Sequence, residues 1–336
     1  MKVTVWNAFE AFRCIAAKCE DSCCQAWEVD VDEDSAAYYL SLPGALGDRL
    51  RQVLKTVDGE ASMTLDEGRC PMWRPDGLCR IQAELGHDAL CHVCREFPRL
   101  RQDYGDFAEW GLELSCPEAA RLIFSCPGVQ TKELPGGTEP EYEAETMAIL
   151  LKSREEALCC IGQADDLPEA LAAVLLFAYQ VQNALDGGEY APLDVNACLA
   201  DARRFAGKGN LSALGDLFAG LEILTKQWPK RLKNLTAAPW KPELKAFAVY
   251  LVRRYWLQAV WDLDLTCRVK FMLAACILVN ALGGNAVETA QLFSKEIEND
   301  PDNLEALLDG AYREKALTDE NLLGLLLDRK KYENPS

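Results

Sequence analysis

Several features that mark common protein classes are missing from this sequence. The first residues, MKVTVWNAFEAFRC, lack the basic start and the apolar run of a secretory signal. The longest apolar stretches, 167–185 and 270–282, are interrupted by charge or glycine before the roughly 20 residues that a membrane-spanning helix needs. We therefore expect a cytoplasmic protein without a membrane segment.

An excess of positive charge is also absent. The chain of 336 residues has 35 lysines and arginines against 53 acidic residues, a formal net charge of −18. Binding to nucleic acid or to an anionic membrane draws most of its affinity from positive charge. The acidic composition therefore argues against both kinds of partner.

Histidine is scarce, with two residues, whereas cysteine is abundant, with 15. In a reducing cytosol such thiols do not form a disulfide framework, so clusters of them indicate metal binding or redox chemistry. Most of them lie in the first 126 residues, at Cys14, Cys19, Cys23, Cys24, Cys70, Cys79, Cys91, Cys94, Cys116 and Cys126.

The spacing of these thiols leaves several kinds of site open. Zinc favours C-x2-C pairs, which Cys91 and Cys94 provide, whereas Cys19 and Cys23 are spaced more loosely. Iron–sulfur clusters accept irregular spacing and take four thiolates each. Redox-active thiols without metal are a further reading, and His92 is either a ligand or a local neighbour. Four thiols lie in helical apolar runs and are expected to be packing residues: Cys159, Cys160, Cys198 and Cys276.

The apolar periodicity predicts a mainly α protein with two domains and a linker. Residues 1–127 form a cysteine-rich domain with short strands, and 128–141, rich in proline and glycine, form the linker. Residues 142–336 are expected to be all-helical. The predicted helices of this part are 142–160, 168–186, 194–206, 211–227, 243–262, 265–282, 286–299, 303–315 and 319–330.

Four cysteine segments together resemble the flagellin lysine N-methylase family. They are FRCIAAKCEDSCCQAW (12–27), CPM with GLCRIQ (70–82), HVCREFPR (92–99) and LSCPEAAR (114–121). In order and spacing they cover about the first 125 residues. The first segment alone also resembles a broader group of zinc- or iron-chelating cysteine-cluster proteins. In the helical part the similarity is weaker and is clearest at 262–271.

The resemblance implies an enzyme that transfers methyl groups from S-adenosylmethionine to lysine ε-amines of flagellin. It also implies an iron–sulfur cluster, expected to be of the 4Fe–4S type, with zinc as the alternative. Cys91 stands where the family is expected to have serine, so it counts as an extra thiol. The cysteines that match the family are Cys14, Cys19, Cys23, Cys24, Cys70, Cys79, Cys94 and Cys116.

Methyl transfer to an amine requires a group that accepts the amine proton and a surface that tolerates a cation. Tyr255, Asp262 and Asp264 supply these types of residue within a short stretch and are the candidate catalytic residues. The alternative is that this stretch is an amphipathic core helix with a polar end. A G-x-G-x-x-G loop and a C-x3-C-x2-C motif are both missing, so the cofactor-binding residues stay unassigned.

Two other functions remain open at this point. One is a non-catalytic module in which bound zinc or iron stabilises the fold of the small domain. The other is an iron–sulfur electron-transfer or thiol-redox protein. Our main hypothesis is that the protein is a methyltransferase with flagellin as its protein partner. The oligomeric state of the protein stays open.

Overall fold

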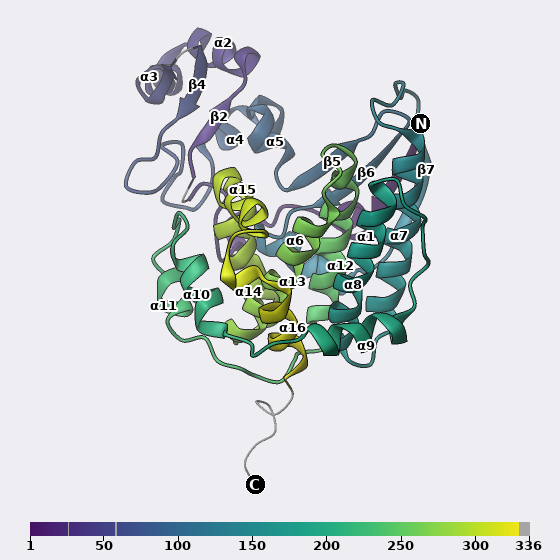
Figure 1. Cartoon of the computed structure of the whole chain (residues 1–336). Helices are drawn as coiled ribbons and strands as arrows, with labels where there is room; N and C mark the ends of the chain where they lie inside the picture. The colour runs from purple at the N-terminus through teal and green to yellow at the C-terminus, as the bar shows by residue number, and fades with distance from the viewer. Residues whose placement is uncertain (26, 58, 329–336) are drawn as a thin grey trace.

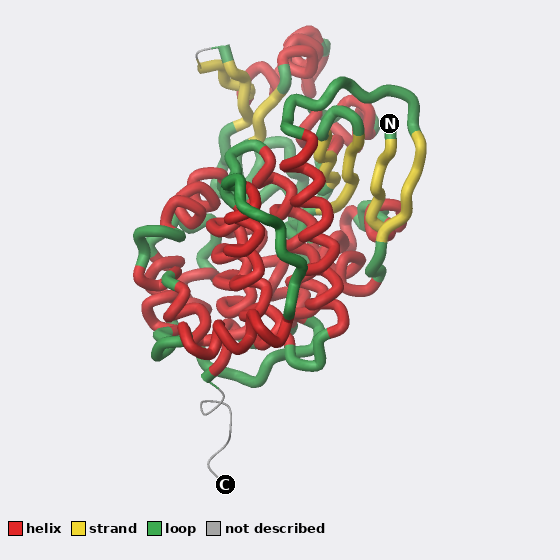
Figure 2. The backbone as a smooth tube through the Cα atoms, turned by 45° about the vertical axis from the view of Figure 1, so that its right-hand side comes forward, coloured by secondary structure: helices red, strands yellow, loops and turns green. Residues whose placement is uncertain are grey.

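The chain folds mainly into helices, and its short strands are confined to the N-terminal part (Figures 1 and 2). The structure is a computed structural model that describes residues 1–25, 27–57 and 59–328. The predicted fold class is confirmed at this level, a mainly α chain with small N-terminal sheets. The metal-binding character of the cysteine-rich part stays a prediction.

The larger sheet has the strand order β5-β6-β1-β7. Its central strand β1 runs parallel to β6 and antiparallel to β7. Val3 and Val5 of β1 are fully buried and pack with Ala108 of β6, as expected for alternating residues with one covered face. The strands are β1 (Lys2–Trp6), β5 (Arg99–Asp103), β6 (Phe107–Leu112) and β7 (Val129–Glu133).

Strand β7 lies inside the stretch 128–141 that the proline and glycine content marked as a linker. The backbone of Gly128 has a φ of +98° and its carbonyl accepts a hydrogen bond from Asn7 N. This contact starts the pairing of β7 with β1. The Pro/Gly signal correctly indicated turns, but it could not show that the five residues after Gly128 find a strand partner.

A second sheet, β2-β4-β3, forms part of a small lobe (residues 29–94) at the upper left of Figure 1. Its core has eleven buried residues, among them Tyr39, Leu50, Met63 and Met72. The elements of the lobe are β2 (Val29–Val31), α2 (Glu33–Ser41), α3 (Gly44–Val53), β3 (Leu54–Val57), β4 (Glu60–Met63), α4 (Arg80–Leu85) and α5 (His92–Glu96).

Two strands of the lobe have no clear local signal in the sequence. The helix α3 ends at Val53, and the next four residues form β3. The polar stretch that follows contains β4, which pairs with β2 and β3 on its two sides. Met63 is opposite both Val29 and Leu54 and is almost fully buried, so a single apolar residue anchors a strand that local sequence does not reveal. Residue 58 of that stretch lies outside the described residues.

The helical body fills the lower part of Figure 1 and surrounds α13 (Leu265–Leu282). By length and by its mean hydropathy of 1.7, α13 could cross a membrane, but it is buried along its whole length. Its place is that of a core helix. The surrounding helices are α7 (Ala144–Gln163), α8 (Leu167–Leu185), α9 (Val195–Phe205), α10 (Leu211–Ala219), α11 (Trp228–Leu232), α12 (Leu244–Tyr255), α14 (Ala286–Phe293), α15 (Pro301–Gly310) and α16 (Asp319–Leu327).

Capping side chains explain why seven of these helices begin close to the predicted positions. In each of the seven a side-chain oxygen accepts a hydrogen bond from a backbone N–H of the first turn. Four predicted helices are shorter or change form: 211–227 ends at Ala219, 243–262 becomes a 3₁₀ helix after Tyr255, 286–299 becomes a π-helical turn after Phe293, and 303–315 ends at Gly310. Residues 329 and 330 of the last predicted helix lie outside the described part. The capping residues are Asp166, Asp194, Asn210, Asp264, Asn285, Asp300 and Thr318.

The main hydrophobic core extends from the helical body into the first residues of the chain. Trp6, Phe12 and Leu112 belong to the same cluster of buried side chains as α8, α12 and α13. The helices α1 (Asn7–Ala11) and α6 (Pro117–Ser125) lie between the larger sheet and this core. The small lobe has a hydrophobic cluster of its own. The domain boundaries inferred from the sequence stay a prediction.

Candidate thiol centre and neighbouring cavities

Backbone hydrogen bonds bring the first two cysteine segments together. The N–H of Cys70 donates to the carbonyl of Cys24 at 2.8 Å, although 46 residues separate them. The chain then reverses at the turn that ends in Gly77, whose φ is +78°. Arg80 N donates back to Met72 O at 2.7 Å, and this returns Cys79 toward Cys70. A turn with a thiol on each side is therefore present.

Two groups of thiols lie close to one another. The neighbouring Cys23 and Cys70 raise the pKa of the Cys24 thiol, and Cys24 in turn lowers the pKa values of Cys23 and Cys70. In the same way Cys91 raises the pKa of Cys94, and Cys94 lowers the pKa of Cys91 to about 7. Such contacts place the sulfur atoms of each group in direct proximity.

These groups and Cys79 form one assembly, which we call the thiol centre: Cys23, Cys24, Cys70, Cys79, Cys91 and Cys94. Cys91 is close enough to Cys70 to disfavour the thiolate form of Cys70 electrostatically, and Cys70 has the same effect on Cys79. All but Cys23 pack in or against the core of the small lobe. The sequence comparison had set Cys91 aside as an extra thiol, but the structure buries it within this assembly.

Three cysteines that match the family lie at the edge of the thiol centre. Cys116 caps α6, and burial together with Cys19 and Cys23 raises its pKa to about 12. Cys19 is half-buried beside Cys14, which is exposed. The structure thus extends the line of thiols from Cys23 toward the larger sheet. His92 is exposed at the start of α5, where its backbone N–H donates to Asp32 at 2.7 Å.

The donor set fits a metal cofactor in its chemistry. In the described residues, no three His, Cys, Asp or Glu side chains converge closely enough to hold a single metal ion. Thiolates are the ligands that structural zinc and iron–sulfur clusters share. Six soft sulfur donors at a small apolar core therefore fit either kind of metal by their chemistry.

A π-helical turn, Ser294–Glu298, joins the thiol segment to the helical body. Lys295 is 3% exposed, and its Nζ lies 2.8 Å from an Asp21 carboxylate oxygen and 5.1 Å from the centre of the Trp27 ring. Its positive charge also helps to lower the pKa of Cys23. Turns of this kind occur often at functional sites. Lys295 therefore anchors the segment that carries Cys19, Cys23 and Cys24.

The three candidate catalytic residues lie in two places, since Asp264 N donates to Asp262 at 3.1 Å whereas Tyr255 is buried in the core. Tyr255 is buried and its hydroxyl donates to Glu298 at 2.6 Å. Asp262 forms a two-pronged ion pair with Arg268, at 2.9 and 2.7 Å. Asp264 caps α13 and accepts a hydrogen bond from Tyr312 at 2.7 Å. The structure does not gather these three side chains into one site, and their catalytic role stays a prediction.

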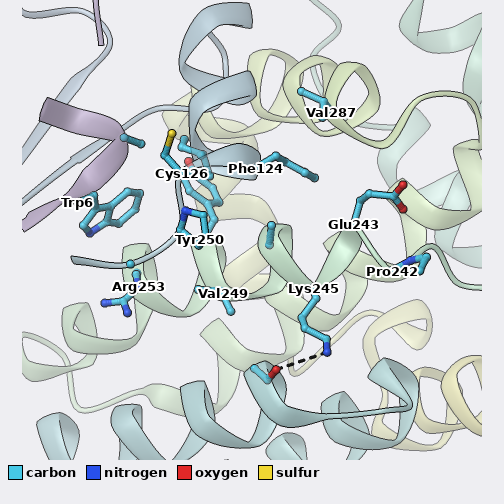
Figure 3. A pocket seen from close by; sticks show the side chains of 16 residues that line it. Trp6, Phe124, Cys126, Pro242, Glu243, Lys245, Val249, Tyr250, Arg253 and Val287 are labelled. Carbon is cyan, nitrogen blue, oxygen red and sulfur yellow. Dashed lines mark hydrogen bonds between the residues drawn. The ribbon is translucent and has the colours of Figure 1, made fainter. Parts of the chain in front are cut away.

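Two cavities flank α6. The polar cavity, of about 870 Å³, lies beside the thiol segment and has walls from Glu20, Asp21, Arg121 and Lys295. The apolar cavity, of about 470 Å³, lies at the other end of α6 and against α12 (Figure 3). Its labelled side chains include Trp6, Phe124, Cys126, Lys245, Tyr250 and Arg253. The sequence contains no local signal for either cavity, because each has walls from segments far apart in the chain.

Comparison with known proteins identifies the relatives of this chain. No family model matches it, and no solved structure matches it. The chain is 33% identical over 123 residues to the flagellar biosynthetic protein FliU of Salmonella muenchen, a match that covers 34% of the chain and 73% of FliU. The chain belongs to the flagellin lysine N-methylase family.

Longer members of the family show the same similarity. The lysine-N-methylases of Salmonella typhimurium and Salmonella choleraesuis are each 32% identical to the chain over 123 residues. These matches cover 34% of the chain but only 31% of each lysine-N-methylase. The chain therefore matches less than a third of the length of these methylases. The activity of the longer proteins is not thereby shown for this chain.

Proposed function

We propose that this protein is an S-adenosylmethionine-dependent methyltransferase that acts on lysine ε-amines of flagellin. The main support for the proposal is the sequence similarity to proteins named lysine-N-methylase and flagellar biosynthetic protein. The acidic surface, from a net charge of −18, supports docking of a lysine-bearing protein. The proposed location is the cytoplasm.

The reaction sets clear demands on the chain. A neutral lysine nitrogen attacks the methyl carbon of the sulfonium, the new N–C bond forms as the C–S bond breaks, and the electron pair of that bond goes to sulfur. The ammonium form of lysine has no free electron pair, so its proton must first pass to a base or to water. The protein must align the two reactants and stabilise a positive charge in the site.

We further propose that the N-terminal cysteines hold an iron–sulfur cluster, with zinc as the alternative metal. The proximity of the six sulfurs in the thiol centre supports this ligand set. Cys14, Cys19 and Cys116 extend the set in the direction of the larger sheet. A bound cluster supplies iron–thiolate bonds that fasten segments 19–24, 70–79 and 91–94 to one another.

Intact-mass analysis tests the proposed activity. Anaerobically purified protein with measured iron and sulfide is incubated with flagellin and S-adenosylmethionine, and flagellin is expected to gain mass in steps of one methyl group. Reactions without the cofactor should give no step. A Cys159→Ser variant, altered at an exposed cysteine outside the thiol centre, should behave like the wild type.

Two results would contradict the proposal. If iron-loaded protein leaves the mass of flagellin unchanged, the methylase activity is wrong and a non-catalytic cysteine-cluster module becomes the better description. If the purified protein is colourless and holds zinc, the cluster is wrong whereas the methylase activity can still stand.

A further inference from the structure

The apolar cavity has the walls of a small-molecule site (Figure 3). Its volume of about 470 Å³ lies in the usual range for ligand pockets, which are mainly apolar with a few polar groups. Trp6 and Phe124 contribute aromatic rings, and Ile123, Val249 and Val287 contribute aliphatic surface. These walls come from β1, α6, α12 and α14, so the cavity lies where the larger sheet meets the helical body.

Most polar groups along this cavity already have partners. The hydroxyl of Tyr250 is hydrogen-bonded to Glu298, and Lys245 Nζ donates to the carbonyl of Ala164 at 2.7 Å. Glu243 is exposed and therefore hydrated. None of these groups therefore needs a ligand as a hydrogen-bond partner.

Arg253 differs from them. It is partly buried, and within the described residues its guanidinium has no hydrogen bond and no ion pair. The nearby Glu109 is held by Arg154 through two hydrogen bonds of 2.7 Å. Burial, followed by the like charge of Arg154, lowers the pKa of Arg253, whereas the opposite charges of Glu155 and Glu109 raise it. Removing a cation from water in this position costs free energy unless an anion compensates its charge.

The polar cavity offers a useful contrast, because its less exposed cations have partners, whereas Arg69 and Lys226 are exposed on its walls. Lys295 pairs with Asp21, and Arg121 pairs with both Glu20 and Glu118. Arg231 donates to two carbonyls and to Thr289. An anion that entered there would have to compete with these contacts. Arg253, which is partly buried and has no hydrogen bond or ion pair within the described residues, therefore favours the apolar cavity as the place for an anionic ligand.

We propose that the apolar cavity is the S-adenosylmethionine site, with Arg253 binding the carboxylate of the methionyl group. Arginine suits this role because its planar fork matches a carboxylate in two parallel hydrogen bonds. The aromatic and aliphatic walls then cover the adenosyl group. This assignment rests on the proposed methyltransferase function, since it takes its ligand from that function.

Binding measurements by titration calorimetry on the whole, metal-loaded protein test the site. Arg253→Gln is expected to weaken S-adenosylmethionine by about ten- to hundredfold, the usual effect of losing a hydrogen bond to a charged group. Decarboxylated S-adenosylmethionine lacks only the carboxylate, so it should bind wild type and Arg253→Gln equally. The matched control is Lys226→Gln, which removes an exposed cation from the wall of the polar cavity and should change neither affinity.

A second variant tests the cavity without touching Arg253. Val249→Trp places an indole in the space between α6 and α12 and should abolish binding of both ligands, while the iron content and the melting temperature stay near those of the wild type. These two readouts separate a blocked site from a misfolded protein.

The possible outcomes distinguish the site from the function. Wild-type protein that binds no S-adenosylmethionine contradicts the proposed cofactor, and the site falls with it. Wild-type binding that neither Arg253→Gln nor Val249→Trp weakens overturns the site alone. Weakening by Lys226→Gln in place of Arg253→Gln would move the cofactor to the polar cavity and also overturn our assignment.

Discussion

The small lobe and the helical body are held together in different ways. The body buries an extensive set of large side chains, including Phe247, Trp256 and Phe293, around α13. The lobe buries eleven residues, and two of these are Cys70 and Cys91. Hydrophobic stabilisation grows with the apolar area removed from water, so a core of this small size gives little of it. We therefore expect the stability of the lobe to depend on its thiols more than that of the body does.

Buried charge follows the same division. In the body, Arg154 pairs with Glu109, and Glu298 accepts hydrogen bonds from Tyr250 and Tyr255. Lys270 and Arg268 are also buried and form ion pairs with Asp319 and Asp262. In the lobe, the buried polar groups of the thiol centre contact one another. Thiols arranged in this way gain a stronger partner only when they bind metal.

Removal of metal should show the largest difference between the two regions. Chelation, or the double change Cys70→Ser and Cys91→Ser, is expected to abolish metal binding and to remove hydrogen-exchange protection from residues 29–94. The helices α8 and α13 should keep theirs, because their core contains none of the thiol centre. Hydrogen exchange measured by mass spectrometry gives the protection of residues 29–94 and that of α8 and α13, with Cys159→Ser as the control. Equal loss of protection in both regions would refute the independence of the body.

The reverse experiment weakens the body. Phe293 is fully buried and its ring lies against those of Phe218, Phe247 and Phe271. Phe293→Ala should lower the free energy of unfolding by about 3–5 kcal/mol, measured by urea denaturation, with the iron content unchanged. Phe205→Ala is the matched control, since Phe205 is 56% exposed on α9 and should change the free energy by less than about 0.5 kcal/mol. An equal effect of the two variants would contradict this picture of the core.

The contact between the regions should have an intermediate effect. Lys295→Met removes the buried cation that binds Asp21 and is expected to cost about 1–3 kcal/mol, the usual range for a hydrogen bond to a charged group. Hydrogen exchange should rise in residues 19–25 and stay unchanged in α8. The control is Lys226→Met, at an exposed lysine of the neighbouring wall. Unchanged exchange in 19–25 would show that Lys295 does not anchor the thiol segment.

Surface ion pairs should contribute least. Arg313 and Asp309 are paired at 2.9 Å on α15 and the turn after it, with side chains that are 70% and 64% exposed. Arg313→Ala should change the free energy of unfolding by less than about 1 kcal/mol, because water screens such pairs. A thermal melt measures this, and a further decrease in its effect at high salt is expected. A loss as large as that from Phe293→Ala would mean that electrostatics, and not packing, hold the body.

The helical body could be predicted well because its signals are local. The helix 265–282 has the predicted bounds, since Asp264 caps its start and Gly283 follows its end. The strands β3, β4 and β7 were missed because each is defined by a partner distant in the chain. Met63, for example, becomes a core residue only when β4 lies between β2 and β3. For the site, the spacing of the cysteines in the sequence identified the candidate ligands. Only the burial of Cys91 in the lobe showed that it belongs to the thiol centre.

The sequence by itself determined the family, through four cysteine segments in a fixed order, and the helices, through apolar periodicity and capping residues. Both are encoded over a few consecutive residues, so they can be recognised without the fold. Only the tertiary structure decided which thiols meet, that Lys295 contacts the thiol segment, and that Arg253 lies beside an apolar cavity without a partner. Side chains 40 to 270 residues apart become neighbours through packing, and no local pattern records this.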